Sequence, residues 1–386
     1  MTRDDRQNPF TPTFGSIPRE LAGRREIIDD VLTGLDNGPG DPNRATIFIG
    51  PRGSGKTVLL AAIAEEASAQ GWISVNVDSD TGMLDEILAQ IYSNARHLLK
   101  PESLSHISSI NIMSIGVGTE KDESTRTTTW RSITTNLVTE LNVLGTGLLI
   151  TVDEVDASTD ELRSLIMAFQ HFVRERKDVA LIMAGLPQRV FSLLREEKVS
   201  FLRRALPVRL GPVDDNDVRL SMRLTIEKAG RQIEPTALSY AVANAKGYPF
   251  MIQLIGYYIW RQNPDMETIT DKDATEGVHF AQTALENRIL EQTYRDLSAK
   301  DIAFLMAMLK DKDYSWVSDI ANRMGVSPKY ASAYRRRLIE QGIIGDKGRG
   351  KVAFELPMIR EYLERTQRDQ EDEADRSSRR SDNLDK

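Results

Sequence analysis

Residues 50–57 read GPRGSGKT and match the pattern Gly-x-x-x-x-Gly-Lys-[Ser/Thr] of a phosphate-binding P-loop. The glycines let backbone N–H groups curl round a phosphate with no Cβ in the way. Lys56 supplies a positive charge for the β- and γ-phosphates, and Thr57 offers a hydroxyl to Mg²⁺. The nucleotide-binding residues predicted from this stretch are Gly50, Pro51, Arg52, Gly53, Ser54, Gly55, Lys56, Thr57 and Val58.

The sequence on either side of the motif supports this prediction. Residues 44–49 (RATIFI) form a short apolar run rich in β-branched residues, as expected for a buried parallel strand. Residues 56–70 are strong helix formers that stop at Gly71. The motif therefore lies between a strand and a helix, whose N-terminus directs unpaired N–H groups and a positive dipole end at the same anion.

A second motif lies at residues 147–156, which read GLLITVDEVD. A buried strand that ends in an acidic pair is the Walker B pattern, and it predicts that Asp153 holds Mg²⁺ together with Thr57. Glu154 is predicted to orient and polarise the attacking water, because phosphoryl transfer depends on positioning and charge stabilisation. Neighbouring strand residues point apart, so one acid can face the metal and the next the water. Asp156 is interpreted as a residue that approaches or caps the next helix.

The composition limits the classes of protein to consider. With 386 residues, of which 40% are hydrophobic and 28% charged, the chain is expected to fold into two or three globular domains. The absence of cysteine excludes disulfides and Cys-ligated zinc, and the 4 histidines do not stand at ligand spacing. No apolar run approaches the ~20 residues that span a bilayer, and the first residues lack the apolar core of a signal peptide. We expect a cytoplasmic protein with no membrane partner.

The alternation of strands and helices predicts the fold class. Up to about residue 210 the pattern is typical of an α/β fold, a parallel P-loop NTPase sheet with helices on both faces. Ligands of such sheets bind beyond the carboxyl ends of the strands, where both motifs lie. A helical lid and a winged helix-turn-helix are expected to follow. The expected units are an extended arm (1–20), the α/β domain (21–213), the lid (214–293), the winged helix (297–362) and a disordered charged tail (363–386), with an insertion of unread function at 101–124.

The winged helix-turn-helix is predicted from residues 297–356. A first helix is capped by Ser298 with Asp301 three residues on, and the third helix has Pro328 in its first turn and stops at Gly342. The stretch IIGDKGRGKVAFEL then gives two short strands joined by a glycine-rich, basic tip, which is the wing.

The charge of this module predicts double-stranded DNA as a partner. Between residues 327 and 351, seven basic residues against two acidic ones give +5, in a chain whose net charge is −7. The predicted DNA-binding residues are Lys329, Ser332 and Arg336 for the major groove, and Arg349 and Lys351 of the wing for phosphates. Tyr330, Tyr334 and Leu338 share another face of the helix and are expected to pack inward. The alternative, that this module binds protein, remains open.

Over residues 15–356 the chain resembles the AAA+ and STAND ATPases, and most of all the archaeal and bacterial initiator-type ATPases of the origin-recognition kind. LAGRRE at 21–26 is similar to the box whose backbone borders the adenine, which implies that Gly23 takes part in nucleotide binding. GYPFMIQ at 247–253 is similar to the G-x-P form of STAND ATPases, which implies that Pro249 packs on the adenine.

Three further positions follow from the resemblance. SFLRRALPVRL at 200–210 looks like an arginine-finger helix, which implies that Arg203 or Arg204 reaches the γ-phosphate in a neighbouring subunit of a homo-oligomer. The family usually has a polar residue, called sensor 1, at the end of the strand at 181–187, but this chain has Ala184 and Gly185 there. Met251 and Gln253 stand where a sensor-2 arginine is usual, which favours a slow, switch-like ATPase.

The sequence thus predicts a Mg²⁺-dependent switch that binds and hydrolyses ATP, and that couples its ATP or ADP state to DNA binding through the winged helix. One alternative is a STAND-type signalling or defence regulator, in which the winged helix packs on the nucleotide domain and binds protein rather than DNA. A helper ATPase that regulates a partner enzyme is a third possibility.

Overall fold

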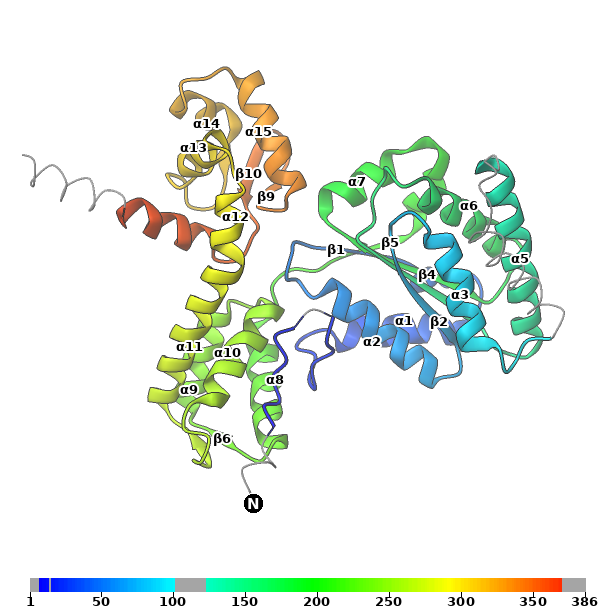
Figure 1. Ribbon diagram of the computed structural model, residues 1–386, viewed down its shortest axis with the longest axis horizontal. Helices are drawn as coiled ribbons and strands as arrows, with labels where there is room; N and C mark the ends of the chain where they lie inside the picture. Colours follow the sequence, from blue (N-terminus) through cyan, green and yellow to red (C-terminus); the bar gives the residue numbers. More distant parts are fainter. Residues whose placement is uncertain (1–6, 14, 101–122, 370–386) are drawn as a thin grey trace, which may run out of the picture.

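The computed structural model describes residues 7–13, 15–100 and 123–369, so most of the predicted insertion lies outside the described residues. The N-terminal α/β domain is built on a five-stranded sheet in the order β2-β3-β4-β1-β5, in which every pairing is parallel (Figure 1). The strands are β1 (Ala45–Ile49), β2 (Ile73–Asp78), β3 (Leu148–Asp153), β4 (Val179–Gly185) and β5 (Leu206–Arg209). The predicted P-loop NTPase sheet is confirmed.

Helices cover both faces of this sheet because successive strand residues point to opposite sides. Leu149 packs into the core under α1 and α2, whereas Ile150 and Val152 pack into the core on the other face. The first face carries α1 (Arg25–Asn37) and α2 (Lys56–Ala69), and the second carries α3 (Met83–Ala95), α5 (Glu123–Val143), α6 (Asp160–Arg174) and α7 (Pro187–Arg195). Two 3-10 segments, η1 (Pro42–Arg44) and η2 (Glu197–Arg204), precede β1 and β5.

The lid is a bundle of helices beside the α/β domain (Figure 1). It contains α8 (Asp215–Lys228), α9 (Pro235–Ala245), α10 (Pro249–Arg261), α11 (Asp271–Leu285) and a short parallel pair, β6 (Gln232–Ile233) and β7 (Thr268–Ile269). A π-helical segment, η3 (Glu286–Leu290), joins α11 to α12 (Glu291–Arg295). The three form one rod that leads from the lid to the C-terminal unit.

The C-terminal unit has the order of helices and strands that the sequence predicts. It consists of α13 (Ala299–Met308), β8 (Ser315–Trp316), α14 (Val317–Arg323), α15 (Pro328–Glu340), β9 (Ile344–Asp346) and β10 (Lys351–Phe354). The strands form an antiparallel sheet in the order β8-β10-β9, and Ser298 and Asp301 form the expected capping box. One continuous hydrophobic core extends from the lid through this unit, so the two are packed together.

Two expectations for this unit are wrong. The tail was expected to be disordered from residue 363, but residues 359–369 are helical and Leu363 is fully buried in the shared core. Tyr330 was expected to pack inward, but it is 45% exposed and its hydroxyl accepts a hydrogen bond from Tyr334. Tyr330 lies in the first turn of α15, beyond the edge of the core that buries Leu338.

The predicted extended arm packs against the lid. Phe10 is 2% exposed and belongs to the lid core, next to the backbone of Gly256 on α10. Within the described residues, no helix has both the length and the apolar character needed to cross a membrane.

The close packing of α10 on α11 generates a stability prediction. A Cβ added at Gly277 would lie 2.6 Å from the Cα of Ile259, so Gly277→Ala must push the two helices apart. Overpacking of this kind typically destabilises a protein by about 1–3 kcal/mol, so we expect the free energy of unfolding of the variant to fall by that amount. Chemical denaturation measures this change. In the matched control Gly211→Ala the added Cβ meets nothing within 4 Å, and a change within about 0.5 kcal/mol is expected. Equal stability of both variants would contradict the close contact.

Candidate functional site

The P-loop follows β1 and ends at the first turn of α2. Gly53 and Gly55 have φ angles of +77° and +85°, a region that residues with a Cβ rarely adopt. Gly55 is also the N-cap of α2, so the loop delivers its backbone directly to the positive end of the helix. The local conformation is therefore that of a phosphate cradle, as the motif predicts.

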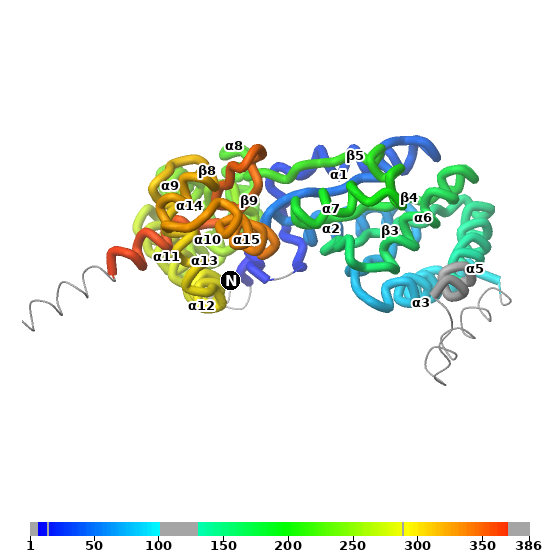
Figure 2. Tube along the Cα trace, turned by 90° about the horizontal axis from the view of Figure 1, so that it is seen from above, coloured from blue at the N-terminus to red at the C-terminus, as the bar shows by residue number. Residues whose placement is uncertain are grey.

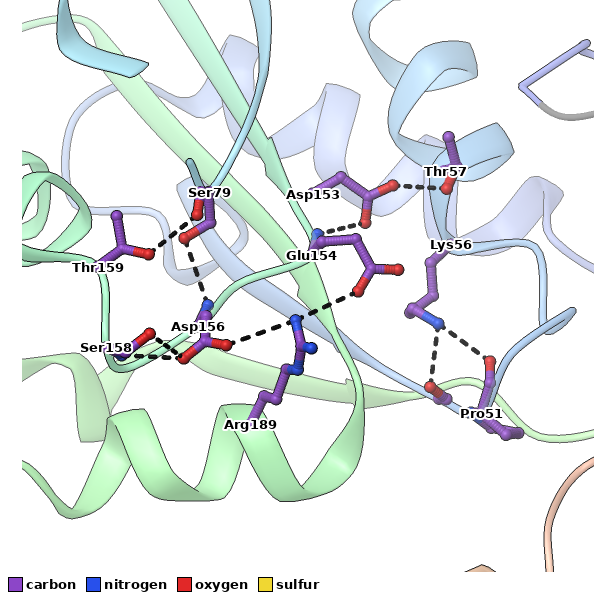
Figure 3. A network of polar contacts seen from close by, with 11 residues as sticks. Pro51, Lys56, Thr57, Ser79, Asp153, Glu154, Asp156, Ser158, Thr159 and Arg189 are labelled. Atoms are coloured by element: carbon purple, nitrogen blue, oxygen red, sulfur yellow. Dashed lines mark hydrogen bonds and ion pairs between the residues drawn. The ribbon is translucent and has the colours of Figure 1, made fainter. Parts of the chain in front are cut away.

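Lys56 is held inside this cradle. Its side chain is nearly buried, and Nζ donates hydrogen bonds to the carbonyl oxygens of Gly50 at 3.1 Å and Pro51 at 3.0 Å (Figure 3). Burial lowers the pKa of Lys56, and the negative charges of Glu154 and Asp153 partly offset that effect. An anionic phosphate in the cradle would favour the charged form of Lys56 further.

The oxygen atoms needed for Mg²⁺ lie together beside Lys56. Thr57 Oγ1 donates to Asp153 Oδ2 at 2.5 Å, and the backbone N–H of Glu154 donates to Asp153 Oδ1 at 2.8 Å (Figure 3). One hydroxyl and one oriented carboxylate fit a Mg²⁺ ion, which proteins bind through one or two carboxylates plus substrate phosphates. Thr57 and Asp153 would hold the ion, and the ion would neutralise charge on the phosphates.

Asp78 is a nearby acid that sequence reasoning missed. It ends β2 and stands opposite Asp153 in the register of the neighbouring strand β3. Burial raises the pKa of Asp78, and the negative charge of Asp153 and other nearby carboxylates raises it further. The signal for it was present in the sequence, because Asp78 follows the alternating run ISVNV at residues 73–77, much as Asp153 follows an apolar run.

Arg189 is a second residue that sequence reasoning missed. It lies on α7, and its Nη1 is 3.8 Å from Glu154 Oε2 and 3.5 Å from Asp156 Oδ2 (Figure 3). Glu154 has a φ angle of +49°, and its side chain is 52% exposed. Asp156 also accepts hydrogen bonds from the backbone and hydroxyl of Ser158, so it lies in the approach to α6, whose N-cap is Thr159. Arg189 therefore forms a loose, solvent-exposed ion pair with Glu154 and a second ion pair with Asp156.

A cavity of about 400 Å³ extends from the P-loop to the lid, within the range of nucleotide and cofactor sites. From the predicted set it is lined by residues 52–58, Glu154 and Pro249. Pro249 lies directly over the loop, since a Cβ at Gly55 would be 3.5 Å from it. Gly23 differs from the prediction, because it backs onto Val213 and Asp217 while its neighbours Leu21, Ala22 and Arg24 line the cavity.

The sensor and finger positions lie around this cavity. Ala184 is buried in the sheet, with its carbonyl oxygen bonded to the N–H of Val155, so the sensor-1 strand supplies no polar side chain there. Met251 is buried in the lid core, whereas Gln253 lines the cavity. Arg203 and Arg204 are exposed at the end of η2 and do not line this cavity. Their action in a neighbouring subunit stays a prediction.

The predicted DNA-binding residues are divided between two places. Lys329, Ser332 and Arg336 line a cleft of about 410 Å³ whose other wall includes Gln188 and Arg195 of α7. Figure 2 shows α15 on the side of the C-terminal unit that faces the α/β domain. The predicted DNA-reading face is therefore turned toward the ATPase domain in this conformation.

The two wing residues have different surroundings. Arg349 is exposed at the tip between β9 and β10, where its φ angle is +46°. Lys351 instead lies over two aromatic rings, with Nζ 4.1 Å from the ring centroid of Tyr314 and 4.7 Å from that of Trp316. Such cation–π contacts attract the ammonium group to the rings, and a contact of Lys351 with a phosphate stays a prediction.

The C-terminal unit also reaches the P-loop itself. A Cβ at Gly342 would lie 3.8 Å from Cγ of Arg52 and 3.7 Å from the side chain of Leu186. A small cavity of about 220 Å³ is lined by Arg52 and Gly53 of the loop, by residues of the lid, and by Gln341 and Leu356 of the C-terminal unit. The P-loop of the α/β domain therefore lies next to both the lid and the C-terminal unit.

Comparison with known families assigns two parts of the sequence. The profile of a family described as "AAA domain" matches residues 41–194. A family described as "Domain of unknown function (DUF8462)" matches residues 287–363, from η3 through the C-terminal unit. Among curated proteins, spastin of Anopheles gambiae is 25% identical over 232 residues, or 58% of this chain and 26% of that protein. The chain thus spans about a quarter of the length of this relative.

Solved structures share the fold at low sequence identity. The Walker-type ATPase PABY2304 of Pyrococcus abyssi superimposes with a TM-score of 0.61 at 15% identity, covering 91% of this chain and 100% of that one. The ADP form of the ORC2 protein of Aeropyrum pernix gives a TM-score of 0.51 at 15% identity, covering 92% and 95%. The segment that matches the AAA domain family, residues 41–194, thus contains both the P-loop and the acidic pair at the end of β3, on a sheet with the P-loop NTPase fold.

Proposed function

We propose that this protein is a Mg²⁺-dependent ATP switch that couples its nucleotide state to the position of its C-terminal unit, and thereby to double-stranded DNA binding. The observation that carries the proposal is that the lid and the C-terminal unit both approach the P-loop. Pro249 of the lid lies over Gly55, and Gly342 of the C-terminal unit lies beside Arg52. A change of the loop on nucleotide binding can therefore be transmitted to both units through these contacts.

The chemistry assigned to the site is hydrolysis of the γ-phosphate. Lys56 and the N-terminus of α2 would stabilise charge on the phosphates, and Thr57 with Asp153 would hold Mg²⁺. Glu154 lines the cavity with a largely exposed carboxylate, which suits a residue that orients water. The loose ion pair with Arg189, at 3.8 Å, leaves this carboxylate accessible to a water in the cavity.

The support for DNA binding is the charge and exposure of α15. Lys329 and Arg336 are exposed, and within the described part of the chain neither forms an ion pair. A helix that reads bases must enter a major groove about 12 Å wide. Because α7 forms the other wall of the cleft, α15 has to move away from α7 before a duplex can approach this face. Nucleotide-driven movement of the C-terminal unit would control that step.

The same contacts favour a second candidate function. In a STAND-type regulator the C-terminal unit stays on the nucleotide domain and binds protein instead of DNA. The approach of Gly342 to Arg52 and the packing of α15 against α7 support this alternative. In the proposed ATP switch, Arg203 or Arg204 would act as an arginine finger on a neighbouring subunit of a homo-oligomer.

Steady-state ATP turnover with and without duplex DNA distinguishes these functions. We expect slow Mg²⁺-dependent turnover by the wild type. The rate of Glu154→Gln should be lower by about 100-fold or more, because positioned acid–base groups contribute roughly 10²–10⁴-fold. Glu154→Gln should still bind MgATP, since Lys56 and Thr57 are unchanged. Duplex DNA should change the wild-type rate, and we expect a rise. DNA binds only the conformation in which α15 is separated from α7 and so increases its population.

Two double variants serve as the matched pair for the DNA effect. Lys329→Ala with Arg336→Ala should abolish stimulation by DNA and keep the basal rate. Lys300→Ala with Lys312→Ala removes the same charge from exposed positions of the C-terminal unit outside the cleft, and should leave stimulation intact. Turnover that is indifferent to DNA in every variant, with ADP retained through purification, would refute the DNA-coupled switch in favour of the second function.

A further inference from the structure

The cleft between α7 and α15 concentrates positive charge from two units of the chain. Its α15 wall carries Lys329, Arg335 and Arg336, and its α7 wall carries Arg195. Among the residues described, Asp346 is the one acid in this lining, and it already forms an ion pair with Arg335 at 2.8 Å. The cleft is therefore strongly basic, although the chain as a whole has a net charge of −7.

Three of these cations are left without an acidic partner. Arg195, Lys329 and Arg336 are exposed, and none of them forms an ion pair with a residue that the structure describes. Arg337, which follows Arg336 on α15, is by contrast paired with Asp301 outside the cleft. The cleft thus holds positive charge that the described part of the protein does not neutralise.

The unpaired cations lie on opposite walls of the cleft. Arg195 is in the last turn of α7, and Lys329 and Arg336 are on α15, which lies beside α7 (Figure 2). Like charges disfavour the close approach of the two walls, although salt screens part of the repulsion. A multivalent anion between the walls attracts both of them and so replaces this repulsion by attraction.

The chemistry and size of the cleft define the anion. The guanidinium groups of Arg195 and Arg336 can each bind a phosphate through two parallel hydrogen bonds. Cations on two walls are matched by a ligand with at least two phosphate groups, and Gln188 and Ser332 add neutral hydrogen-bonding groups. The volume of about 410 Å³ suits a small molecule, and a duplex is too wide to enter while α7 forms the second wall.

We propose that this cleft binds a small anion with two or more phosphate groups, and that the bound anion holds α15 against α7. The site shares no lining residue with the P-loop cavity, so it is a second phosphate site. A ligand that contacts both walls favours the arrangement in which they are close. Because Lys329 and Arg336 are also the proposed DNA contacts, the anion competes with duplex DNA, and this last step alone rests on the proposed function.

The test measures the dissociation constant of inorganic tripolyphosphate by isothermal titration calorimetry. The protein is saturated with MgADP, so that the P-loop is occupied, and free Mg²⁺ is kept constant. We expect Arg195→Ala to weaken tripolyphosphate binding about 10- to 100-fold, because charge-assisted hydrogen bonds are lost. The matched control Arg174→Ala removes an exposed arginine from the last turn of α6 and should change the affinity by less than about twofold.

Inositol hexakisphosphate is titrated in parallel with tripolyphosphate. Tighter binding of one of them shows whether the cleft fits a chain of phosphates or phosphates on a ring, and either result supports the site if Arg195→Ala weakens it. Equal binding by wild type and Arg195→Ala would overturn the site, because the anion would then lie elsewhere. So would a wild type that binds MgADP but neither anion. Failure to bind MgADP would instead refute the proposed nucleotide binding.

Two further readouts separate the cleft from the DNA surface. Arg195→Ala should keep the affinity of the wild type for duplex DNA, because Arg195 lies on α7 and DNA binds α15 after the two helices have separated. An equal loss of affinity for tripolyphosphate and for DNA would overturn the proposal. In the presence of MgADP, tripolyphosphate should also weaken DNA binding by the wild type, and it should do so much less in Arg195→Ala. Equal competition in both proteins would contradict the role of α7.

Discussion

The contact of the P-loop with the two units that follow it is the constraint on which the rest of the structure depends. The loop must keep its backbone open to phosphate, so it presents glycines at the places where other elements approach. Pro249 approaches Gly55, and Phe250 approaches Gly53. The C-terminal unit approaches the next loop residue, Arg52, through Gly342. These contacts are the structural basis of the proposed coupling between the nucleotide state of the loop and the positions of the two other units.

The packing of the other units decides what moves. The lid and the C-terminal unit share one hydrophobic core and are joined by the rod of α11, η3 and α12 (Figure 1). They are therefore expected to move together relative to the sheet. A ligand can shift this equilibrium only by its differential affinity for the two arrangements. The cavity offers such a difference, because its walls come from the arm and lid on one side and the P-loop on the other.

The parts of the site that sequence predicts well are those fixed by short-range patterns. The P-loop and the pair Asp153–Glu154 each sit at a strand end, where residue type and spacing determine the geometry. The role of Arg189 could not be predicted in this way, because its approach to Glu154 depends on how α7 packs after β4. The anchoring of Phe10 was equally invisible, since the arm has no periodicity and its partner Gly256 is far along the chain.

The basic face of α15 shows a related limit. The positive charge of α15 predicts affinity for phosphate. It does not predict which other element of the same molecule faces α15, and in this structure that element is α7. Tyr330 differs from its expected inward packing for a similar reason, because helical periodicity gives a direction and not the extent of the core. Residues 363–369 were assigned to a solvated tail by composition, although Leu363 packs into the core.

The central claim is that nucleotide state controls the distance between α7 and α15. Because the chain has no cysteine, spin labels can be placed at Lys198→Cys and Glu340→Cys alone, both at exposed positions. Pulsed electron paramagnetic resonance then gives the distance distribution for the ligand-free protein, with MgADP, and with MgATP in the Glu154→Gln background. The account predicts a longer distance with MgATP than with MgADP. The same distribution in all three states would contradict it.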